Sequence, residues 1–579
     1  MFAASSGMVV LATDPAMSGG KAGVAFALGC VGVAILAICI YTGVGMLCRA
    51  LGEVRFKPVR NLITGAGALV ILTTGYALLG SPFLRADGYS VRPPAPTSIQ
   101  AGGTNVVWVV LDTVRADHVG CYGFDAPTTP FLDEWSSRAT LFERCYSNAI
   151  WTIPSHTSMF TGLSVRQHGA NANHAWLDEQ TPTVAEQFSE AGYSTIAFSN
   201  NPWVVPDTNL VKGFKEFRAM HRLHALTGVS LERLAERWGV TPPLPWLDGD
   251  FGAALTNHAI ARWLDSRSAG DPPFLMFINY MEAHLPYRVP RRYRRIFMTA
   301  EQVDRSYDLR WSVFGNVVPA LNDRYNDEGS DFVSLADREI LRLQYQAAIR
   351  YLDDRLHELM DLLEQAGRGG DTLIVVTSDH GEYLDTHDMW SHCYQTYNDV
   401  AHVPLIIREP GQSEGRRVST PVQPSDLYPT LINAALGLSE RGPGYYGRDL
   451  IELANGGDTT RMAVVEYYGP GQWKVEDLRR LGDPVLDHRA QPQFAVGGEQ
   501  FKFLVSEDGV RELYDISIDP GELDNLIGER VYEVRRMHSY LKTWLEQIPK
   551  YVPSVDSRPK GMSEKTRDAL RGLGYLGDE

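Results

Sequence analysis

The chain has 579 residues, a formal net charge of −16 and 44% hydrophobic residues. This length exceeds one ordinary domain and allows a large core with appendages. The acidic balance argues against a nucleic-acid partner, because binding to a phosphate backbone needs a basic surface. The six cysteines lack framework spacing and therefore predict neither a disulfide scaffold nor a zinc-thiolate site.

The N-terminal region contains two stretches without a charged residue, 22–48 and 61–84. Each is long enough to cross a bilayer as a helix, although a buried helical hairpin is the alternative. The connection 49–60 is basic, with four cationic residues against Glu53. The positive-inside rule places this connection in the cytoplasm. We therefore predict a two-helix membrane anchor over 1–85, followed by an extracytoplasmic chain.

Residues 86–104 contain Pro93, Pro94 and Pro96 and predict an extended linker. Beyond it, continuous apolar runs alternate with helical patterns. This alternation indicates an α/β fold whose mixed, mostly parallel sheet is flanked by helices. In such sheets functional groups gather at the carboxyl ends of strands. The predicted strands are 106–111, 195–198, 274–278, 373–376 and 403–407, and the predicted helices are 183–191, 253–266, 337–365 and 424–436.

We predict a catalytic domain over 105–455, with insertions near 215–250 and 291–335 where the alternation fails. These insertions are candidates for a partly helical lid. A smaller α+β subdomain over 456–579 follows. Its predicted elements are strands at 494–505 and 510–516, a turn at Asp508-Gly509, and an amphipathic helix at 531–548.

Carboxylates and imidazoles follow several of the predicted strands. Asp112 ends the first run, His284 comes shortly after the third, and Asp379 and His380 end the fourth, with His392 soon after. Singly, such an Asp is usually a turn former and such a His a structural residue. Together, Asp112, Asp379 and His380 match the oxygen and nitrogen ligands of a divalent metal ion.

A candidate nucleophile lies in Trp151-Thr152-Ile153-Pro154-Ser155-His156. Pro154 can open a helix, because the first helical turn has no intrahelical use for its N–H. Thr152 then lies where unpaired backbone N–H groups and the positive end of the helix dipole converge. Taken alone, such a Thr is more often only a helix N-cap.

These motifs occur in an order that resembles the sulfatase branch of the alkaline phosphatase superfamily, from about residue 106 to 526. The residues that carry the resemblance are Leu111-Asp112-Thr113-Val114-Arg115-Ala116-Asp117, Thr152-Ile153-Pro154-Ser155-His156, Phe160-Thr161-Gly162, His168-Gly169, Glu282-Ala283-His284-Leu285-Pro286, Thr377-Ser378-Asp379-His380-Gly381-Glu382 and Glu512-Leu513-Tyr514-Asp515.

The nucleophile motif departs from the family pattern. Sulfatases of the formylglycine type carry Cys or Ser, followed by x-Pro-x-Arg, whereas this chain has Thr152 and His156. Thr113 also replaces the usual second Asp of the first metal motif. Thr cannot become formylglycine. The Thr version resembles lipoteichoic-acid synthases, phosphoethanolamine transferases and nucleotide pyrophosphatases, in which a metal-bound Thr attacks phosphoesters.

The resemblance implies roles for ten residues. Asp112, Thr152, Asp379 and His380 would surround one ion, with Mn²⁺ or Zn²⁺ favoured over Ca²⁺ or Mg²⁺ because of the imidazole ligand. The side chains expected to face the substrate are His284, His392 and Asn173. The two histidines would protonate the leaving group or hold a second ion, and Asn173 would contact nonbridging oxygens. The residues expected to orient the metal ligands from outside are Arg115, Asp117 and Glu382.

The sequence therefore predicts a membrane-anchored, metal-dependent hydrolase or phosphotransferase. Its expected substrate is a phosphoester in an extracytoplasmic glycan, lipid or polymer. Two alternatives stay open: hydrolysis of sulfate esters without formylglycine, and a non-catalytic surface or interaction protein that keeps the fold. The chain has no Gly-rich Lys motif for nucleotide phosphates, so an ATPase is excluded.

Overall fold

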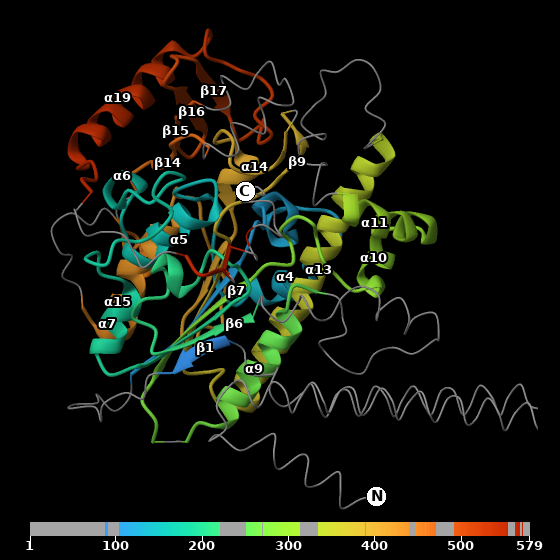
Figure 1. The fold of residues 1–579 in the computed structure, drawn as a ribbon. Coiled ribbons are helices and arrows are strands. Elements are labelled where there is room, and N and C mark those ends of the chain that lie inside the picture. The colour runs from blue at the N-terminus through green and yellow to red at the C-terminus, as the bar shows by residue number, and fades with distance from the viewer. Residues whose placement is uncertain are drawn as a thin grey trace, which may run out of the picture. The chain divides into compact units, whose positions relative to one another are not determined.

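The computed structural model describes residues 87–90, 103–220, 250–312, 334–438, 447–470, 491–553 and 562–570, except residues 269, 388, 458, 565, 568 and 569. Both predicted membrane spans and residues 91–102 of the predicted linker lie outside these ranges. Within them, no helix combines the length and the apolar character needed to cross a bilayer. Figure 1 gives the arrangement of the elements.

The large sheet has nine strands in the order β1-β6-β5-β7-β2-β8-β12-β3-β13. Its five central members run parallel and bury nearly all their side chains, as expected for strands covered on both faces. They are β6 (Glu216–Ala219), β5 (Ser194–Ser199), β7 (Phe274–Tyr280), β2 (Asn105–Leu111) and β8 (Thr372–Thr377). The parallel strands predicted around residues 106, 195, 274 and 373 are therefore confirmed.

Beyond β8 the sheet is mixed. The predicted strand 403–407 is divided at Pro404 into β11 (His402–Val403) and β12 (Leu405–Arg408), because proline has no N–H for the ladder. β12 runs antiparallel to β8 and to β3 (Thr140–Phe142), and β13 (Arg416–Val418) closes this edge. β11 pairs separately with β4 (Cys145–Tyr146).

The opposite edge extends into two segments that the sequence did not assign to the sheet. β1 (Asp87–Ser90), within the predicted linker, pairs antiparallel with β6. β6 itself lies at the start of the predicted insertion 215–250, so the sheet extends into the first residues of that stretch. β6 alternates half-buried Glu216 and Arg218 with buried residues, and this edge pattern lacks the continuous apolar run used to find the central strands.

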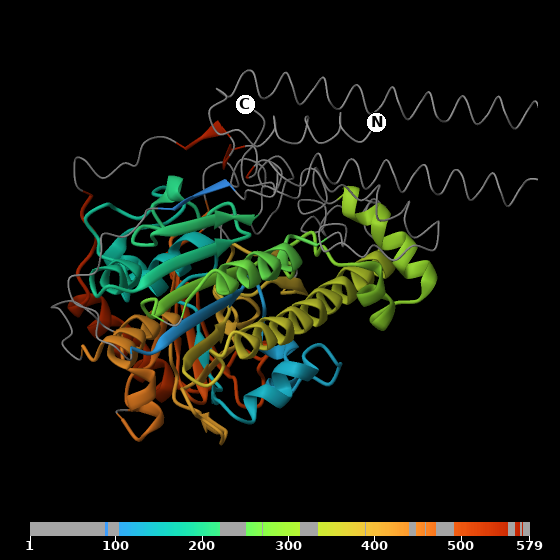
Figure 2. The same cartoon turned by 90° about the horizontal axis from the view of Figure 1, so that it is seen from below.

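Helices cover both faces of the sheet (Figures 1 and 2). One layer contains α9 (Ala253–Asp265), the long α13 (Leu335–Gln365) and α4 (Pro130–Ser136), which contact one another through α13. The other contains α5 (Thr152–Thr161), α7 (Val184–Glu190) and α15 (Leu427–Leu436). The helices predicted at 183–191, 253–266 and 337–365 are confirmed, and the one at 424–436 begins with a 3-10 turn, Pro424–Asp426.

Shorter helices lie between these elements. α6 (Val165–His168) comes after α5, α14 (Asn398–Ala401) precedes β11, and α16 (Leu450–Ala454) contacts α15. The predicted insertion near 291–335 contributes α10 (Arg291–Phe297) and α11 (Ala300–Ser312), which contact α13. Its part 313–333 lies outside the described residues.

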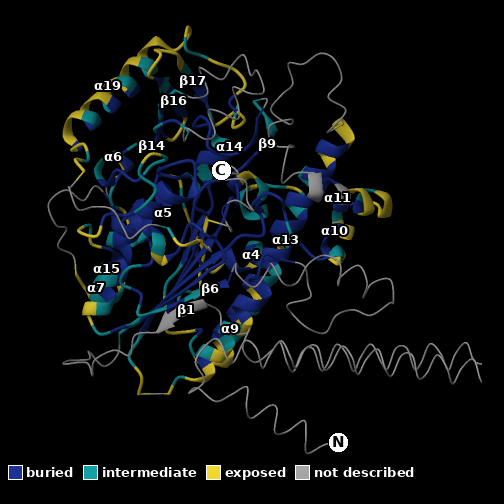
Figure 3. Ribbon diagram, viewed as in Figure 1, coloured by how far each residue is buried: buried dark blue, intermediate teal, exposed yellow. Residues whose placement is uncertain are grey.

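The C-terminal part forms an antiparallel sheet in the order β14-β15-β16-β17. Its strands are β14 (Ala463–Tyr467), β15 (Gln493–Gly497), β16 (Phe501–Ser506) and β17 (Arg511–Asp515). The predicted strand 494–505 is thus two strands, and β14 was not predicted. The turn at Asp508-Gly509 is confirmed by the hydrogen bond from Gly509 N to Ser506 O. Helix α19 (Val531–Gln547) buries Met537, Leu541 and Trp544 against this sheet. Much of the rest of the helix is exposed (Figure 3).

Candidate active site

Thr152 is the first residue of helix α5 and is completely buried. The N-cap is Trp151, so the hydroxyl of Thr152 is not used as a helix cap. The first turn of an α-helix leaves its N–H groups without intrahelical partners. Thr152 therefore lies beside such groups, as the sequence predicted. Thr152 Oγ1 instead lies 3.3 Å from Nδ2 of Asn201. The simple N-cap interpretation is therefore wrong.

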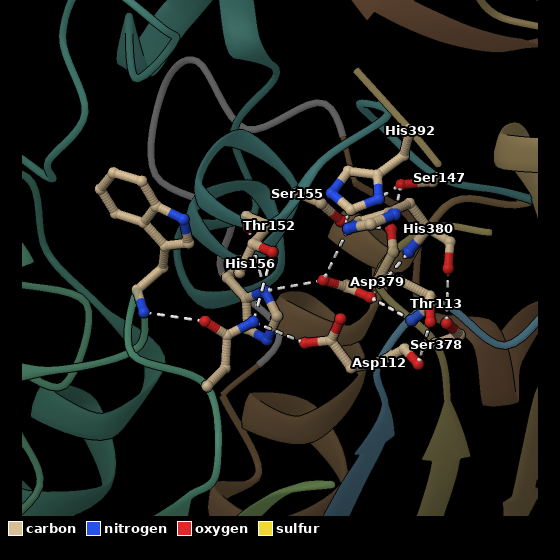
Figure 4. Close-up of polar contacts among 12 residues, drawn as sticks. Asp112, Thr113, Ser147, Thr152, Ser155, His156, Ser378, Asp379, His380 and His392 are labelled. Carbon is tan, nitrogen blue, oxygen red and sulfur yellow. Dashed lines mark hydrogen bonds and ion pairs between the residues drawn. The ribbon is translucent and has the colours of Figure 1, made fainter. Parts of the chain in front are cut away.

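Asp112, Asp379 and His380 meet at the carboxyl ends of two neighbouring parallel strands (Figure 4). Val110 of β2 lies opposite Thr377 of β8, so Asp112 and Asp379 each come two residues after an aligned pair. One ligand atom from each of the three side chains lies within 4.8 Å of the others. The sequence prediction that these three residues converge is confirmed.

Three inward-facing atoms of this cluster fit a divalent cation. Asp112 Oδ1, Asp379 Oδ2 and His380 Nε2 are buried without a hydrogen-bond partner among the described residues. Leaving buried lone pairs unsatisfied costs about 1–3 kcal/mol each, and more for charged groups. A cation coordinated by all three would satisfy them together. The donor set of two carboxylates and one imidazole suits a divalent metal ion.

The opposite atoms of the same groups are already satisfied. Asp112 Oδ2 accepts from Asn201 Nδ2 at 2.7 Å and from Asn279 Nδ2 at 3.2 Å. Asp379 Oδ1 accepts from the backbone amides of Thr113 at 3.2 Å and His380 at 2.9 Å. The Nδ1 of His380 lies 2.9 Å from Gly381 O, so it donates and leaves the Nε2 lone pair facing inward. Such outer partners fix ligand orientation.

Burial controls the charges of the cluster. It lowers the pKa of His380 to about 4, so the ring is neutral at pH 7, as metal ligation requires. Burial, followed by repulsion from Asp112, raises the pKa of Asp379 above its ordinary value. Two carboxylates this close cannot both ionise comfortably without a compensating positive charge. A bound cation would supply that charge.

The loop after β2 is held in an unusual backbone conformation. Thr113 has φ of 61°, in the left-handed region that β-branched residues rarely adopt. This conformation directs its amide to Asp379, while its hydroxyl donates to Asp112 O at 2.7 Å. Thr113 therefore contributes a backbone donor to the cluster and directs its side chain back along the chain. Local strain of this kind is common at functional sites.

Helix α5 is fastened to the backbone of Asp379. Ser155 Oγ donates to Asp379 O at 2.7 Å, and Ser147 Oγ makes a short hydrogen bond to the same oxygen. Gly381 is needed nearby, because an added Cβ would lie 2.0 Å from Asp399 O. These contacts set the distance between Thr152 and the cluster.

His156 occupies the position of the family arginine and carries no charge at neutral pH. Burial lowers its pKa to about 4. Its Nδ1 lies 3.0 Å from Thr152 O and 3.4 Å from Asp379 Oδ2, and its Nε2 lies 3.5 Å from Asn279 Nδ2. The ring therefore hydrogen-bonds to the first turn of α5 through Thr152 O, lies close to Asp379 and contributes no cation.

His284 and His392 lie beside the cluster. The ring centroid of His392 is 4.5 Å from that of His380 and 5.1 Å from that of His284. Glu382 Oε1 lies 3.1 Å from His392 Nδ1, and Glu382 Oε2 accepts from Leu285 N at 3.3 Å. Glu382 thus contacts His392 directly, whereas its predicted role is to orient the metal ligands.

Arg115 connects the loops after β2 and β8. It pairs with Asp117 at 2.6 Å and with Asp399 at 2.7 Å, and its Nη1 donates to Glu382 O at 3.1 Å. Asp117 is more peripheral, with 54% of its side chain exposed. The supporting roles expected of both residues stay predictions.

Asn173 is exposed, and its backbone amide donates to Asn171 Oδ1 at 2.9 Å. Among the described contacts, none joins Asn173 to the cluster. Asn201 and Asn279 contact Asp112 instead, and the sequence analysis gave neither a role. Ser199 of β5 is aligned with Asn279 of β7, which is aligned with Val110 of β2. Asn201 therefore comes two residues after Ser199, just as Asp112 comes two residues after the aligned Val110. A search for polar residues just past the ends of the parallel strands could have found Asn201.

The protein-family model for sulfatases matches residues 104–438. The chain belongs to the sulfatase family. It is a sulfatase-family hydrolase with an alkaline phosphatase-like fold. It is similar to the uncharacterised sulfatase YidJ of Escherichia coli, with 26% identity over 470 residues, which cover 77% of this chain and 87% of that protein. An arylsulfatase of Clostridium perfringens is 24% identical, over 74% and 92% of the two chains.

Solved structures support the same fold. A phosphonate monoester hydrolase of Agrobacterium radiobacter superposes with a TM-score of 0.56 and 23% identity, over 77% of this chain and 95% of that one. A second phosphonate monoester hydrolase, from Silicibacter pomeroyi, also gives 0.56, at 21% identity over 77% and 96% of the chains. These likenesses establish the fold of the described catalytic part.

The cluster predicts metal-dependent stability. Adding Mn²⁺ to metal-free protein should raise the free energy of unfolding by about 2.7 kcal/mol at a free ion concentration 100 times the dissociation constant. The shift should grow with pH, because the raised pKa of Asp379 means that metal binding releases a proton. Thermal unfolding with and without Mn²⁺ measures it.

Asp379→Asn should abolish the Mn²⁺-dependent shift, because it removes one ligand charge. Asp361→Asn is the matched control, since this carboxylate is 60% exposed on α13. An undiminished shift in Asp379→Asn would contradict the assigned ligands.

Proposed function

We propose that this protein is a metal-dependent ester hydrolase or phosphotransferase in which Thr152 Oγ1 attacks a phosphoester. One observation carries the proposal. The amide of Asn201 is shared between Thr152 Oγ1 and Asp112 Oδ2, beside three inward-facing atoms without hydrogen-bond partners. A hydroxyl in this position lies against the cluster where a cation would be held.

The cation, held by Asp112, Asp379 and His380, would promote loss of the Thr152 proton and offset charge on the substrate oxygens. The protein's own groups supply the remaining functions. Asn201 orients Thr152 Oγ1 through its amide. His156 holds the carbonyl of the same residue. Burial of the whole group excludes competing water and strengthens each electrostatic contact.

The proposed reaction has two displacements. Thr152, having lost its proton to water, forms a bond from Oγ1 to phosphorus, and the bond to the leaving oxygen breaks. The leaving oxygen keeps the electron pair and takes a proton from His392 Nε2. In the second displacement His392 removes a proton from water, whose oxygen bonds to phosphorus and releases Thr152. An acceptor alcohol in place of water would make the enzyme a transferase.

His392 suits the proton-transfer role better than His284. Its Nδ1 lies against the carboxylate of Glu382, which stabilises positive charge on the ring. The Nδ1 of His284 instead contacts a neutral acceptor, Leu285 O, at 2.6 Å. We assign proton transfer to His392 and substrate binding to His284.

The charge balance favours a monoanionic substrate. Asp112 and Asp379 together neutralise a divalent cation, and His380 and His156 are neutral at pH 7. A phosphodiester or phosphonate monoester carries one negative charge at the reacting group, whereas a phosphate monoester carries about two near neutral pH. The site therefore suits monoanionic esters better.

A sulfate ester is also monoanionic and remains the second candidate. The identity of Thr152 favours the phosphoester. A sulfate group transferred to Thr152 forms an alkyl sulfate on Cβ. Because this Cβ carries no second hydroxyl, no neighbouring oxygen could expel the sulfate. The phosphoester intermediate can be released by attack of water at phosphorus.

We also propose that the active site lies outside the cytoplasm, anchored to the bilayer by helices over 22–48 and 61–84. The uncharged lengths of these stretches and the basic connection 49–60 support this topology. An envelope glycan, lipid or polymer ester is then the accessible substrate. Protease added to sealed, oriented membrane vesicles should cleave the catalytic domain only when the extracytoplasmic face of the membrane is on the outside. Protection in that orientation would contradict the topology.

Thr152→Ala should lower turnover of an aryl phosphodiester by at least about 10³-fold, because it removes the attacking oxygen. Thr152→Ser keeps a hydroxyl and should retain measurable activity. Thr157→Ala, one turn further along α5, is the control for helix damage, since Thr157 Oγ1 only donates to Ile153 O. Among an aryl phosphodiester, an aryl phosphate monoester and an aryl sulfate, the diester should be turned over fastest. Full activity of Thr152→Ala would eliminate this nucleophile.

His392→Gln should slow esters with poor leaving groups more than esters with good ones. An alkyl leaving group needs a proton, so its rate should fall by about 10²–10⁴-fold, whereas a p-nitrophenyl group leaves without one. Comparing the two substrates in single-turnover experiments measures the difference. His357→Gln, at an exposed position of α13, should change neither rate. Equal losses on both substrates in His392→Gln would exclude proton donation to the leaving group.

A further inference from the structure

A buried ion pair joins the C-terminal sheet to the catalytic part. Lys502 of β16 and Glu522, in the loop after β17, are both fully buried, and Lys502 Nζ lies 2.9 Å from Glu522 Oε1. Removing two charges from water costs several kcal/mol per ion, and apolar residues of similar size often stabilise a fold as well or better. Stability alone therefore explains this pair poorly.

The pair binds the first residue of α14. Lys502 Nζ donates to Asn398 Oδ1 at 2.9 Å, and Asn398 N makes a short hydrogen bond to Glu522 Oε2. The N-cap of α14, Tyr397, makes no side-chain cap hydrogen bond. The carboxylate of Glu522, from another part of the chain, satisfies one of the N–H groups that the first turn leaves without an intrahelical partner.

α14 in turn holds the loop that carries Asp379 and His380. Gly381 N donates to Val400 O at 2.9 Å, and Asp399 O lies so close to Gly381 that no Cβ fits between them. Asp399 also pairs with Arg115 at 2.7 Å. A displacement of α14 would therefore move the residues directly after the two proposed metal ligands.

The same loop determines the place of His392. Arg115 Nη1 donates to Glu382 O at 3.1 Å, and the Glu382 carboxylate contacts His392 Nδ1. A continuous series of buried contacts thus leads from Lys502 and Glu522 through α14 to the cluster and to the proposed proton donor.

We propose that Lys502 and Glu522 are positioning residues of the active site, which hold α14 and thereby the loop of Asp379, His380 and Glu382 in its metal-binding arrangement. The proposal rests on the function proposed above. It gives the C-terminal subdomain a role in the reaction even though neither residue touches the cluster. Groups that hydrogen-bond the metal ligands directly change metal affinity by about 10–100-fold, so a pair that acts through α14 should have an effect at or below the lower end of that range.

The test separates positioning from stability by replacing the pair with apolar residues. The double variant Lys502→Met/Glu522→Leu removes both charges together and leaves neither ion unpaired, so its melting temperature should stay near that of the unmodified protein. Its Mn²⁺ dissociation constant, measured by calorimetry, should rise several-fold, up to about tenfold. In the metal-free protein, amide hydrogen exchange over residues 380–401 should become faster.

The control is the surface pair Arg536 and Glu533 on α19, 2.7 Å apart in the same subdomain, with side chains 43% and 22% exposed. Arg536→Met/Glu533→Gln should change neither Mn²⁺ affinity nor exchange. If the buried double variant does not fold, Glu522→Gln keeps the size and the oxygen acceptor for Asn398 N and should show a smaller change in the same direction.

Unchanged Mn²⁺ affinity and unchanged exchange in the folded variants would overturn the inference. Failure of the proposed function looks different: the unmodified protein would bind no Mn²⁺ and turn over no ester. In that case the exchange of the metal-free loop still decides whether the pair positions it.

Discussion

The site depends on the burial of two carboxylates, Asp112 and Asp379, at the ends of adjacent parallel strands. Their separation follows from strand register, because each comes two residues past the aligned pair Val110 and Thr377. Burial and mutual repulsion make this arrangement costly in a metal-free protein, as the raised pKa of Asp379 indicates. The neighbouring contacts can be understood as ways of reducing that cost, with a cation completing the compensation.

The surrounding residues reduce the cost largely with neutral donors. The side-chain amides of Asn201 and Asn279 and the backbone amide of Thr113 satisfy the outward oxygens, and His156 contributes a neutral ring. This leaves the cluster without surplus positive charge. A site of this kind discriminates by the charge of the substrate. His392, the proposed proton donor, is paired with the buried carboxylate of Glu382, which stabilises positive charge on its ring.

Much of the fold and part of the site followed from the sequence. Continuous apolar runs identified the central parallel strands, and parallel strands necessarily bring their ends together, so the convergence of Asp112, Asp379 and His380 was predictable. Loop paths were not. Asn201 reaches Asp112 only because of the turn after β5, and Glu382 contacts His392 because of the fold of its loop. The roles of the residues stay predictions, since proximity does not establish chemistry.

The central claim is that Thr152 Oγ1 bonds to phosphorus during turnover. The most direct test mixes the metal-loaded protein with an aryl phosphodiester, stops the reaction in acid during the first turnover, and maps the modified peptide by mass spectrometry. The account predicts a mass increase equal to the transferred phosphoryl group, located on Thr152. An unmodified Thr152 while a burst of product has formed, or the added mass on another residue, would contradict it.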